Sequence, residues 1–134
     1  MKIEIVTPEK IAYSDEADLI SLPTPEGEIT VLPGHVSLVT QLLPGEITAK
    51  RGSQYIILAS GGGFAKISKD KVSVVTDLAQ RPEEIDERAA EEARKRAEEA
   101  LTERERLSEE EFALVAASLQ KALAQLRVKR RHRH

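Results

Sequence analysis

A histidine lies in a sharp corner of this sequence, close to two carboxylates. The segment EGEITVLPGHVSLVTQL places His35 directly after Pro33 and Gly34, and Glu26 and Glu28 come shortly before it. Histidine and carboxylate side chains are the usual groups of acid–base catalysis. However, no serine or cysteine nucleophile signature accompanies His35, and no second histidine stands at metal-ligand spacing. We therefore interpret His35 as a turn histidine that is hydrogen-bonded to the backbone.

Two further features could have a chemical function, and each also has a purely structural interpretation. Glu26 and Glu28 share one face of an extended chain, where they are either solvated or available to a cationic partner. Ser60 is followed by three glycines, but the Lys-Ser/Thr pair of a phosphate-binding loop is missing. Between two strands, such a glycine run predicts a bulge or a tight crossing. The sequence thus predicts no catalytic residue and no metal site.

The first 81 residues have the pattern of short strands. Runs rich in β-branched and aliphatic residues alternate with turn signals such as Pro-Glu-Gly, Pro-Gly and Arg-Gly. In the first run, Ile3 and Ile5 face one way and Lys2 and Glu4 the other. The runs lie at residues 2–8, 17–23, 28–33, 36–43, 46–50, 54–60, 64–68 and 71–78. Their spacing predicts an antiparallel β-sandwich or barrel over residues 1–81.

From residue 82 the pattern becomes helical. Glycine is absent after this point, and Ala, Glu, Arg and Leu dominate. Apolar residues at spacings of three and four predict two helices. The stripe of the first helix is Ile85, Ala89, Ala93, Ala97, Ala100/Leu101 and Leu107, and that of the second is Phe112, Val115, Leu119, Ala122/Leu123 and Leu126.

Ser108 and Glu111 match a capping box at the start of the second helix. A turn of one or two residues between the helices then predicts an antiparallel hairpin over residues 82–134. Because alanine buries little area, the first stripe predicts a hairpin that is only weakly stable. Overall, the sequence predicts an α+β protein in which an antiparallel sandwich precedes a two-helix hairpin.

Charge is distributed unevenly along the chain. The net charge of −3 excludes a bulk attraction for nucleic acid or anionic lipid. Every charged side chain from Lys121 onward is basic. Without interleaved aromatic residues, the terminal RVKRRHRH is expected to meet an acidic protein surface or the acidic first helix rather than RNA. The basic residues of the second helix and tail include Lys121, Arg127, Lys129, Arg130 and Arg131.

Targeting signals are not evident. Met1 leads directly into a strand-like run, and no apolar stretch approaches the ~18 residues that a transmembrane helix needs. Cysteine is absent, so disulfides and thiolate metal sites are excluded. We expect a protein of the cytosolic side that does not insert into lipid.

Four segments, in order along the chain, resemble the epsilon subunit of bacterial F-type ATP synthases. EGEITVLPGHVSLVTQL resembles the Leu-Pro-Gly-His segment of the family, and GGGFAKISKDKVSVVTDLAQR its Gly-Gly-Phe strand pair. IDERAAEEARKRAEEAL is similar to the first C-terminal helix of the family, and LQKALAQLRV to the last. Two positions depart from the family pattern, since Thr30 replaces a glycine and Ser37 a proline.

The resemblance implies a non-catalytic subunit of the rotating central stalk, peripheral to the cytoplasmic face of the bacterial cell membrane. Its sandwich is expected to join the gamma subunit to the membrane c-ring, so that proton-driven rotation reaches the catalytic head. The corner of Pro33, Gly34 and His35 would rest on the ring together with Glu28, which would be available to an arginine of a ring loop.

In the hairpin, the resemblance implies a switch. When extended, the basic second helix would enter the catalytic alpha/beta head and block ATP hydrolysis. Members that bind ATP as a regulatory ligand carry Ile/Leu-Asp-x-x-Arg-Ala. Here Ile85 and Asp86 match, but the arginine is Arg88, rotated by about 100° on a helix. On the second helix, Lys121 stands where such members place basic residues. The alternative is a free-standing β-sandwich that binds ATP or another anion beneath a helical lid.

Overall fold

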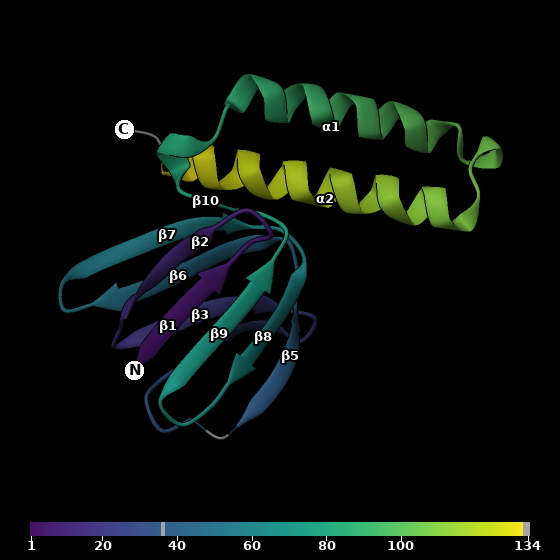
Figure 1. The fold of residues 1–134 in the computed structure, drawn as a ribbon. Helices are drawn as coiled ribbons and strands as arrows, with labels where there is room; N and C mark the ends of the chain where they lie inside the picture. The colour runs from purple at the N-terminus through teal and green to yellow at the C-terminus, as the bar shows by residue number, and fades with distance from the viewer. Residues whose placement is uncertain (36, 133–134) are drawn as a thin grey trace.

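The computed structural model describes residues 1–35 and 37–132, and it contains a β-sandwich followed by two helices (Figure 1). The two helices are α1, Glu87–Thr102, and α2, Glu109–Arg131. The prediction of an α+β fold, a sandwich followed by a two-helix hairpin, is confirmed. The strands of the described residues are β1 Lys2–Val6, β2 Ile11–Glu16, β3 Leu19–Thr24, β4 Gly27–Val31, β5 Leu38–Leu42, β6 Gly45–Arg51, β7 Gln54–Ser60, β8 Gly63–Ile67, β9 Lys71–Thr76 and β10 Ala79–Gln80.

Two five-stranded sheets face each other in the sandwich. The first has the order β2-β1-β9-β8-β5, and the second has the order β10-β7-β6-β3-β4. Neighbouring strands are antiparallel except β1 and β9, which pair in parallel. Alternate side chains of strands such as β1, β3, β6 and β9 fill the space between the sheets, as the sequence predicts for Ile3 and Ile5. The largest fully buried side chains are Ile3, Ile5, Ile20, Leu22, Leu42, Ile47, Leu58, Ile67, Val31, Val72, Val74 and Val128.

Two strands were not predicted. β2 (Ile11–Glu16) is an edge strand whose residues are exposed or half-buried, so it lacks the apolar run by which the other strands are recognised. β10 comprises only Ala79 and Gln80. The glycine run, in contrast, is a tight crossing as predicted, because a Cβ on Gly63 would collide with the backbone of Val75.

The helices begin with well-formed caps. Asp86 caps α1, since its carboxylate accepts the backbone N–H of Ala89 at 3.0 Å. Ser108 and Glu111 form the predicted capping box of α2. The connection between the helices differs from the expected one- or two-residue turn: residues 103–108 join them and include a 3₁₀ turn at Arg104–Arg106.

The stripe of the first helix differs from the predicted one only at its start, since Ala97 is buried and Ala93, Ala100 and Leu101 are half-buried as predicted. Ile85 precedes α1, and Ala89 is exposed, whereas Ala90 and Ala97 are buried. The helix period explains the difference, because Ala90 lies seven residues, or about two turns, before buried Ala97 and shares its face, whereas Ala89 is turned by about 100° from Ala90. Ile85 instead packs with Ala59 of β7 and Val128 of α2.

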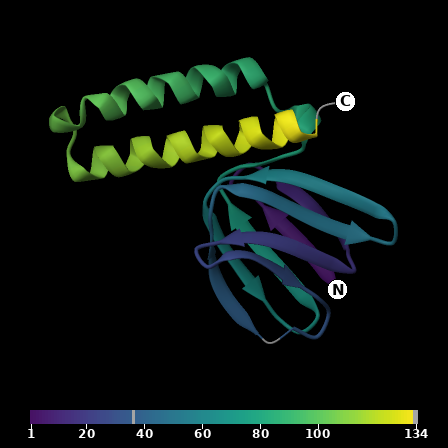
Figure 2. The same cartoon turned by 180° about the vertical axis from the view of Figure 1, so that it is seen from behind.

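The hairpin lies across one end of the sandwich. In both Figure 1 and Figure 2, α2 lies between α1 and the strands, and the end of the hairpin that contains the helix connection projects beyond the sandwich. The C-terminal part of α2 therefore rests on the sandwich, chiefly on β7 and β6, while its N-terminal part overhangs.

Candidate functional site

The Pro-Gly-His corner lies at the end of the sandwich that is farthest from the hairpin. Gly34 adopts a left-handed conformation with φ of 85°, and its N–H donates to the carbonyl of Lys69 at 2.9 Å. The N–H of His35 donates to the carbonyl of Leu32 at 3.2 Å. The first bond joins the corner to the β8–β9 turn, and the second closes the corner itself through the backbone of His35.

Glu28 is not brought next to this corner. It is exposed near the start of β4, where it pairs with Pro23, whereas Pro33 follows the other end of the strand. An extended chain between the two covers roughly 17 Å. The predicted ring-facing residues thus lie at two separate places: Glu28 is exposed on edge strand β4, and the corner with half-buried His35 follows that strand.

An apolar row that was not predicted crosses the outer face of the first sheet. On β1, Val6 pairs with Ile11 of β2 and with Val75 of β9. Val75 pairs in turn with Phe64 of β8, and Val39 lies on the neighbouring β5. Apart from the half-buried Val6, each is between 60% and 67% exposed. We call Ile11, Val6, Val75, Phe64 and Val39 the apolar row.

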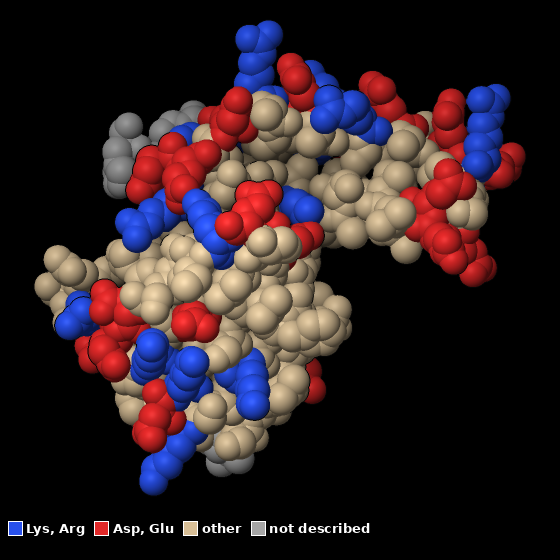
Figure 3. Space-filling model, in the orientation of Figure 1, with Lys and Arg blue, Asp and Glu red and all other residues tan. Residues whose placement is uncertain are grey.

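The sequence carries a signal for this row. In the run at residues 71–76, Val72 and Val74 alternate toward the core, and Val75 breaks the alternation. An outward-facing valine next to an outward-facing Phe64 is typical of a surface that another protein covers. Figure 3 shows that uncharged side chains gather on the sandwich nearer the hairpin, while lysines and carboxylates lie toward the opposite end.

Side chains at every fourth position of α2 contact residues 77–82, the segment that leads from the sandwich to α1. Lys121 pairs with Asp77 at 2.9 Å, and the amide of Gln125 donates to Gln80 at 2.8 Å. The ammonium of Lys129 donates to the carbonyl of Pro82 at 2.8 Å. Spacing by four places these α2 side chains on one face of the helix. This face is the one by which the hairpin docks.

The C-terminal end of α2 adds a second group of contacts to the sandwich. His132 lies 2.7 Å from Glu46 of β6, and Arg131 lies 3.5 Å from the same carboxylate. The apolar part is small, consisting of Ala59, Ile85 and Val128 with Ile57 beside them. Docking therefore depends on a few apolar side chains and several polar ones.

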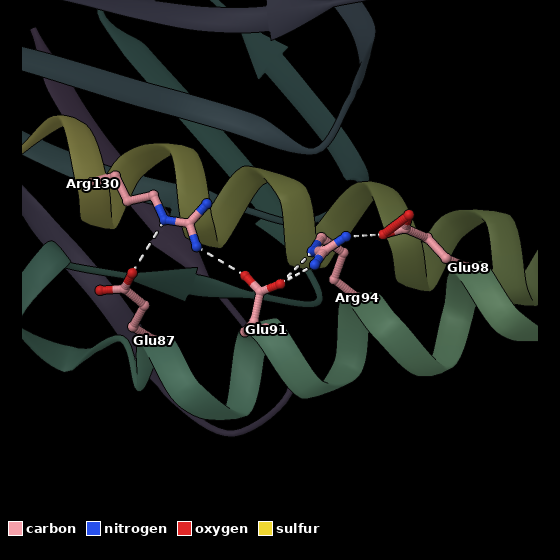
Figure 4. A network of polar contacts seen from close by, with 5 residues as sticks. All are labelled: Glu87, Glu91, Arg94, Glu98 and Arg130. Carbon is pink, nitrogen blue, oxygen red and sulfur yellow. Dashed lines mark hydrogen bonds and ion pairs between the residues drawn. The ribbon is translucent and has the colours of Figure 1, made fainter.

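A polar network joins the two helices (Figure 4). Arg130 of α2 contacts Glu87 at 3.1 Å and Glu91 at 2.8 Å, while Arg94 bridges Glu91 and Glu98. The hydrogen bonds from Arg94 and then Arg130 lower the pKa of the Glu91 carboxyl below its usual value. The expected contact of the basic C-terminal segment with the acidic first helix is confirmed for Arg130. Arg133 and His134 of the predicted tail lie outside the described residues.

The predicted nucleotide-binding residues are not gathered into one site. Ile85 is buried, and Asp86 is engaged in the helix cap. The side chain of Arg88 is 91% exposed and lies 3.6 Å from Glu92. Lys121 pairs with Asp77 instead, about 13 Å along α2 from Arg130, the residue that faces the start of α1.

The predicted inhibitory residues are mostly occupied in the folded hairpin. Four of them contact the sandwich, the residues that lead from it to α1, or α1 itself: Lys121, Lys129, Arg130 and Arg131. The fifth, Arg127, is exposed. Within the described part of the chain, no cluster of three His, Asp or Glu side chains is arranged to hold a metal ion. None of the described helices combines the length and apolarity of a membrane span.

Two family models together match nearly the whole chain. The ATP synthase delta/epsilon chain β-sandwich domain matches residues 1–82, and the long α-helix domain of the same chain matches residues 83–130. An ATP synthase epsilon chain from Herpetosiphon aurantiacus is 37% identical, covering 100% of this chain and 97% of the relative. One from Dehalococcoides mccartyi is 39% identical, covering 99% and 94%.

Solved structures share the fold. A chain of the Euglena gracilis mitochondrial ATP synthase OSCP/F1/c-ring assembly superposes with a TM-score of 0.74 at 24% identity, covering 91% of this chain and 76% of that one. A chain of the Tetrahymena thermophila mitochondrial ATP synthase central stalk and c-ring has a TM-score of 0.55 at 15% identity, covering 63% and 68%.

Proposed function

The chain belongs to the epsilon-subunit family of F-type ATP synthases, and we propose that it is a non-catalytic rotor element that couples proton-driven ring rotation to ATP synthesis. In this role the sandwich transmits torque and the hairpin regulates hydrolysis. The protein acts at the cytoplasmic face of the bacterial cell membrane, held there through the complex.

The apolar row carries the proposal for the sandwich. A monomer in water seldom exposes Ile, Val and Phe side chains side by side, because each exposed apolar side chain forgoes its burial energy. We assign the row to the gamma subunit. The Pro-Gly-His corner and the exposed Glu28 are assigned to the polar loops of the c-ring. Because the corner follows β4 of the second sheet, whereas Phe64 and Val75 lie on the outer face of the first sheet, one molecule can contact both partners at once.

The weak docking of the hairpin supports a switch. Among the described residues, a small apolar cluster and a set of polar contacts fix α2 to the sandwich. A switch needs two states that differ by a few kcal/mol, and such contacts can be exchanged at that cost. On extension, Lys121, Lys129, Arg130 and Arg131 lose their partners and join Arg127 as a basic surface. This surface would enter the alpha/beta head and inhibit ATP hydrolysis.

Reconstitution with the partner subunits tests both assignments. Phe64→Ser is expected to weaken binding of the chain to purified gamma subunit, whereas Lys66→Ser, on the same strand and face, is expected to bind as the wild type does. A chain that ends at Arg81 is expected to assemble and to leave ATP hydrolysis uninhibited. Equal affinity of the Phe64 variant and the wild type would contradict the role of the apolar row.

One observation favours the second candidate, an ATP- or anion-binding sandwich with a helical lid. A hollow of about 420 Å³ lies between β7 and the C-terminal end of α2, and Arg81, Lys129 and His132 line it together with Tyr55 and Glu83. Basic groups beside an aromatic ring suit a phosphate-bearing aromatic ligand. Thermal unfolding of the isolated chain with and without ATP discriminates the two, since only the second candidate requires a marked stabilisation.

A further inference from the structure

The overhanging part of the hairpin forms a groove with the rim of the sandwich. We call it the rim groove; its volume is about 450 Å³. Leu43 and Pro44 line it from the β5–β6 connection, and Leu114 and Ala117 line it from α2. Figure 3 shows the hairpin projecting over the sandwich there, with mostly uncharged side chains around the notch.

The groove continues the docking face of α2. Leu114, Ala117 and Lys121 follow one another at spacings of three and four, so they share a side of the helix. From Lys121 onward this side rests on the sandwich, through Gln125 and Lys129. Before Lys121 the helix has passed the rim, and the same side faces open space. Leu114 is consequently 70% exposed although it belongs to a docking face.

The charge of the groove indicates what fits it. Among the described residues that line it, the charged side chains are Lys121 and Asp77, and these pair with each other at 2.9 Å. A charged occupant would therefore find no free counter-charge and would be desolvated at a cost. An apolar segment would instead cover Leu114, Leu43 and Pro44.

The rim groove is continuous with the apolar row. Gln41 lines the groove, and on the outer face of the sheet it lies directly opposite Phe64 of the row. A protein that covers Phe64 therefore reaches the mouth of the groove without crossing a charged region. The row alone offers contact to the sandwich, while the groove offers contact to the sandwich and α2 together.

We propose that the rim groove receives an uncharged, apolar segment of the same stalk partner that covers the apolar row. This rests on the proposed function, in which that partner is the gamma subunit. Since one wall of the groove is α2, the groove exists only while the hairpin is folded. The partner therefore binds the folded hairpin more tightly than the extended one, and favours the folded state by that difference.

Binding of full-length variants to purified gamma subunit tests the proposal. Leu114→Glu places a charge in the groove, and Ala113→Glu makes the same change at an exposed neighbour that does not line it. Leu114→Glu is expected to lower the affinity about tenfold, as for the loss of a buried leucine contact. Ala113→Glu is expected to leave it unchanged. A photo-crosslinking residue at position 114, but not one at position 113, is expected to capture gamma.

Phe64→Ser separates failure of this inference from failure of the proposed function. Wild-type affinity for Leu114→Glu with weakened binding for Phe64→Ser would overturn the groove contact and retain the row. Wild-type affinity for both would overturn both. If Leu114→Glu instead changed only the sedimentation of the isolated chain, a second copy would be the occupant and the proposal would be wrong.

Discussion

The sandwich and the hairpin are packed in opposite ways. Between the sheets, large side chains such as Ile3, Ile5 and Leu22 are fully buried. In the hairpin, four of the six buried residues of α1 and α2 are alanines. Since burial energy grows with apolar area, each sandwich position contributes more than each hairpin position. The sandwich is thus held by the burial of large side chains, whereas the hairpin buries mostly alanines and is joined by arginine–glutamate contacts.

The largest expected effect lies in the sandwich. Ile5→Ala removes a fully buried side chain from β1, and we expect it to lower the free energy of unfolding by about 2–5 kcal/mol. Ile11→Ala, at a site that is 61% exposed, serves as the control and is expected to change it by less than about 0.5 kcal/mol. Urea unfolding measures both. Similar losses for the two variants would contradict the assignment of the core.

The next largest effect is expected in the docking of α2 on the sandwich, without a change in the stability of the sandwich itself. Val128→Asp introduces a carboxylate into the small cluster with Ala59 and Ile85, and is expected to weaken docking by about 2 kcal/mol or more. Hydrogen exchange of α2 amides should then accelerate, while sandwich amides stay protected. Ala113→Asp, at an exposed position, is the control. Unfolding of the sandwich together with α2 would show that the two regions are one cooperative unit.

A smaller effect is expected from the network between the helices. Arg130→Met removes the contacts to Glu87 and Glu91, and because solvent screens an exposed arginine we expect only a small loss of hairpin stability. Exchange of the amides of residues 87–102 should rise several-fold. Arg127→Met, one helical turn earlier and exposed, should leave this exchange unchanged. The same rate of amide exchange at residues 87–102 in Arg130→Met and Arg127→Met would show that the network does not stabilise the hairpin.

The smallest effect is the pH dependence of the same network. The pKa of Glu91 is lowered in the folded state by Arg94 and Arg130, so its contribution to stability is present above the ordinary glutamate pKa of 4.5. This contribution is lost as the pH falls from there through the lower, folded-state pKa. Helix circular dichroism between pH 7 and pH 3 measures the loss, and Glu91→Gln should show a smaller one. An equal loss in the variant would assign the acid transition to other carboxylates.

Local patterns were enough to predict most of the fold. Alternation placed Ile3 and Ile5 inside because a strand has a strict period of two, and this period does not depend on distant contacts. The change of period near residue 82 revealed the helices, and Ser108 with Glu111 located the start of α2 through a contact three residues long. β2 escaped detection because an exposed edge strand carries little apolar signal.

Within the candidate site, local sequence patterns predicted the type of residue but not its contact partner. The basic character of the end of α2 is visible in the sequence, but the partners Asp77, Pro82 and Glu46 come from distant segments. The predicted stripe placed Ala89 inside because periodicity alone leaves an uncertainty of one residue where a helix begins. Ala90 faces inward instead, because it lies about two turns before buried Ala97 on the same face of the helix.

By itself, then, the sequence determined that a β-sandwich precedes a two-helix hairpin, the family, and the small apolar area of the hairpin, because each depends on residues close together in the chain. Tertiary structure alone decided that Ile11, Val75, Phe64 and Val39 form one exposed row, since strands distant in sequence meet there only through the sheet order. Tertiary structure also decided how far α2 overhangs the rim. The position of the hairpin is set by contacts of Lys121, Gln125 and Lys129 with residues 77–82, which lead from β9 to α1. Side-chain periodicity describes one element at a time, whereas a surface shared by several elements requires their packing.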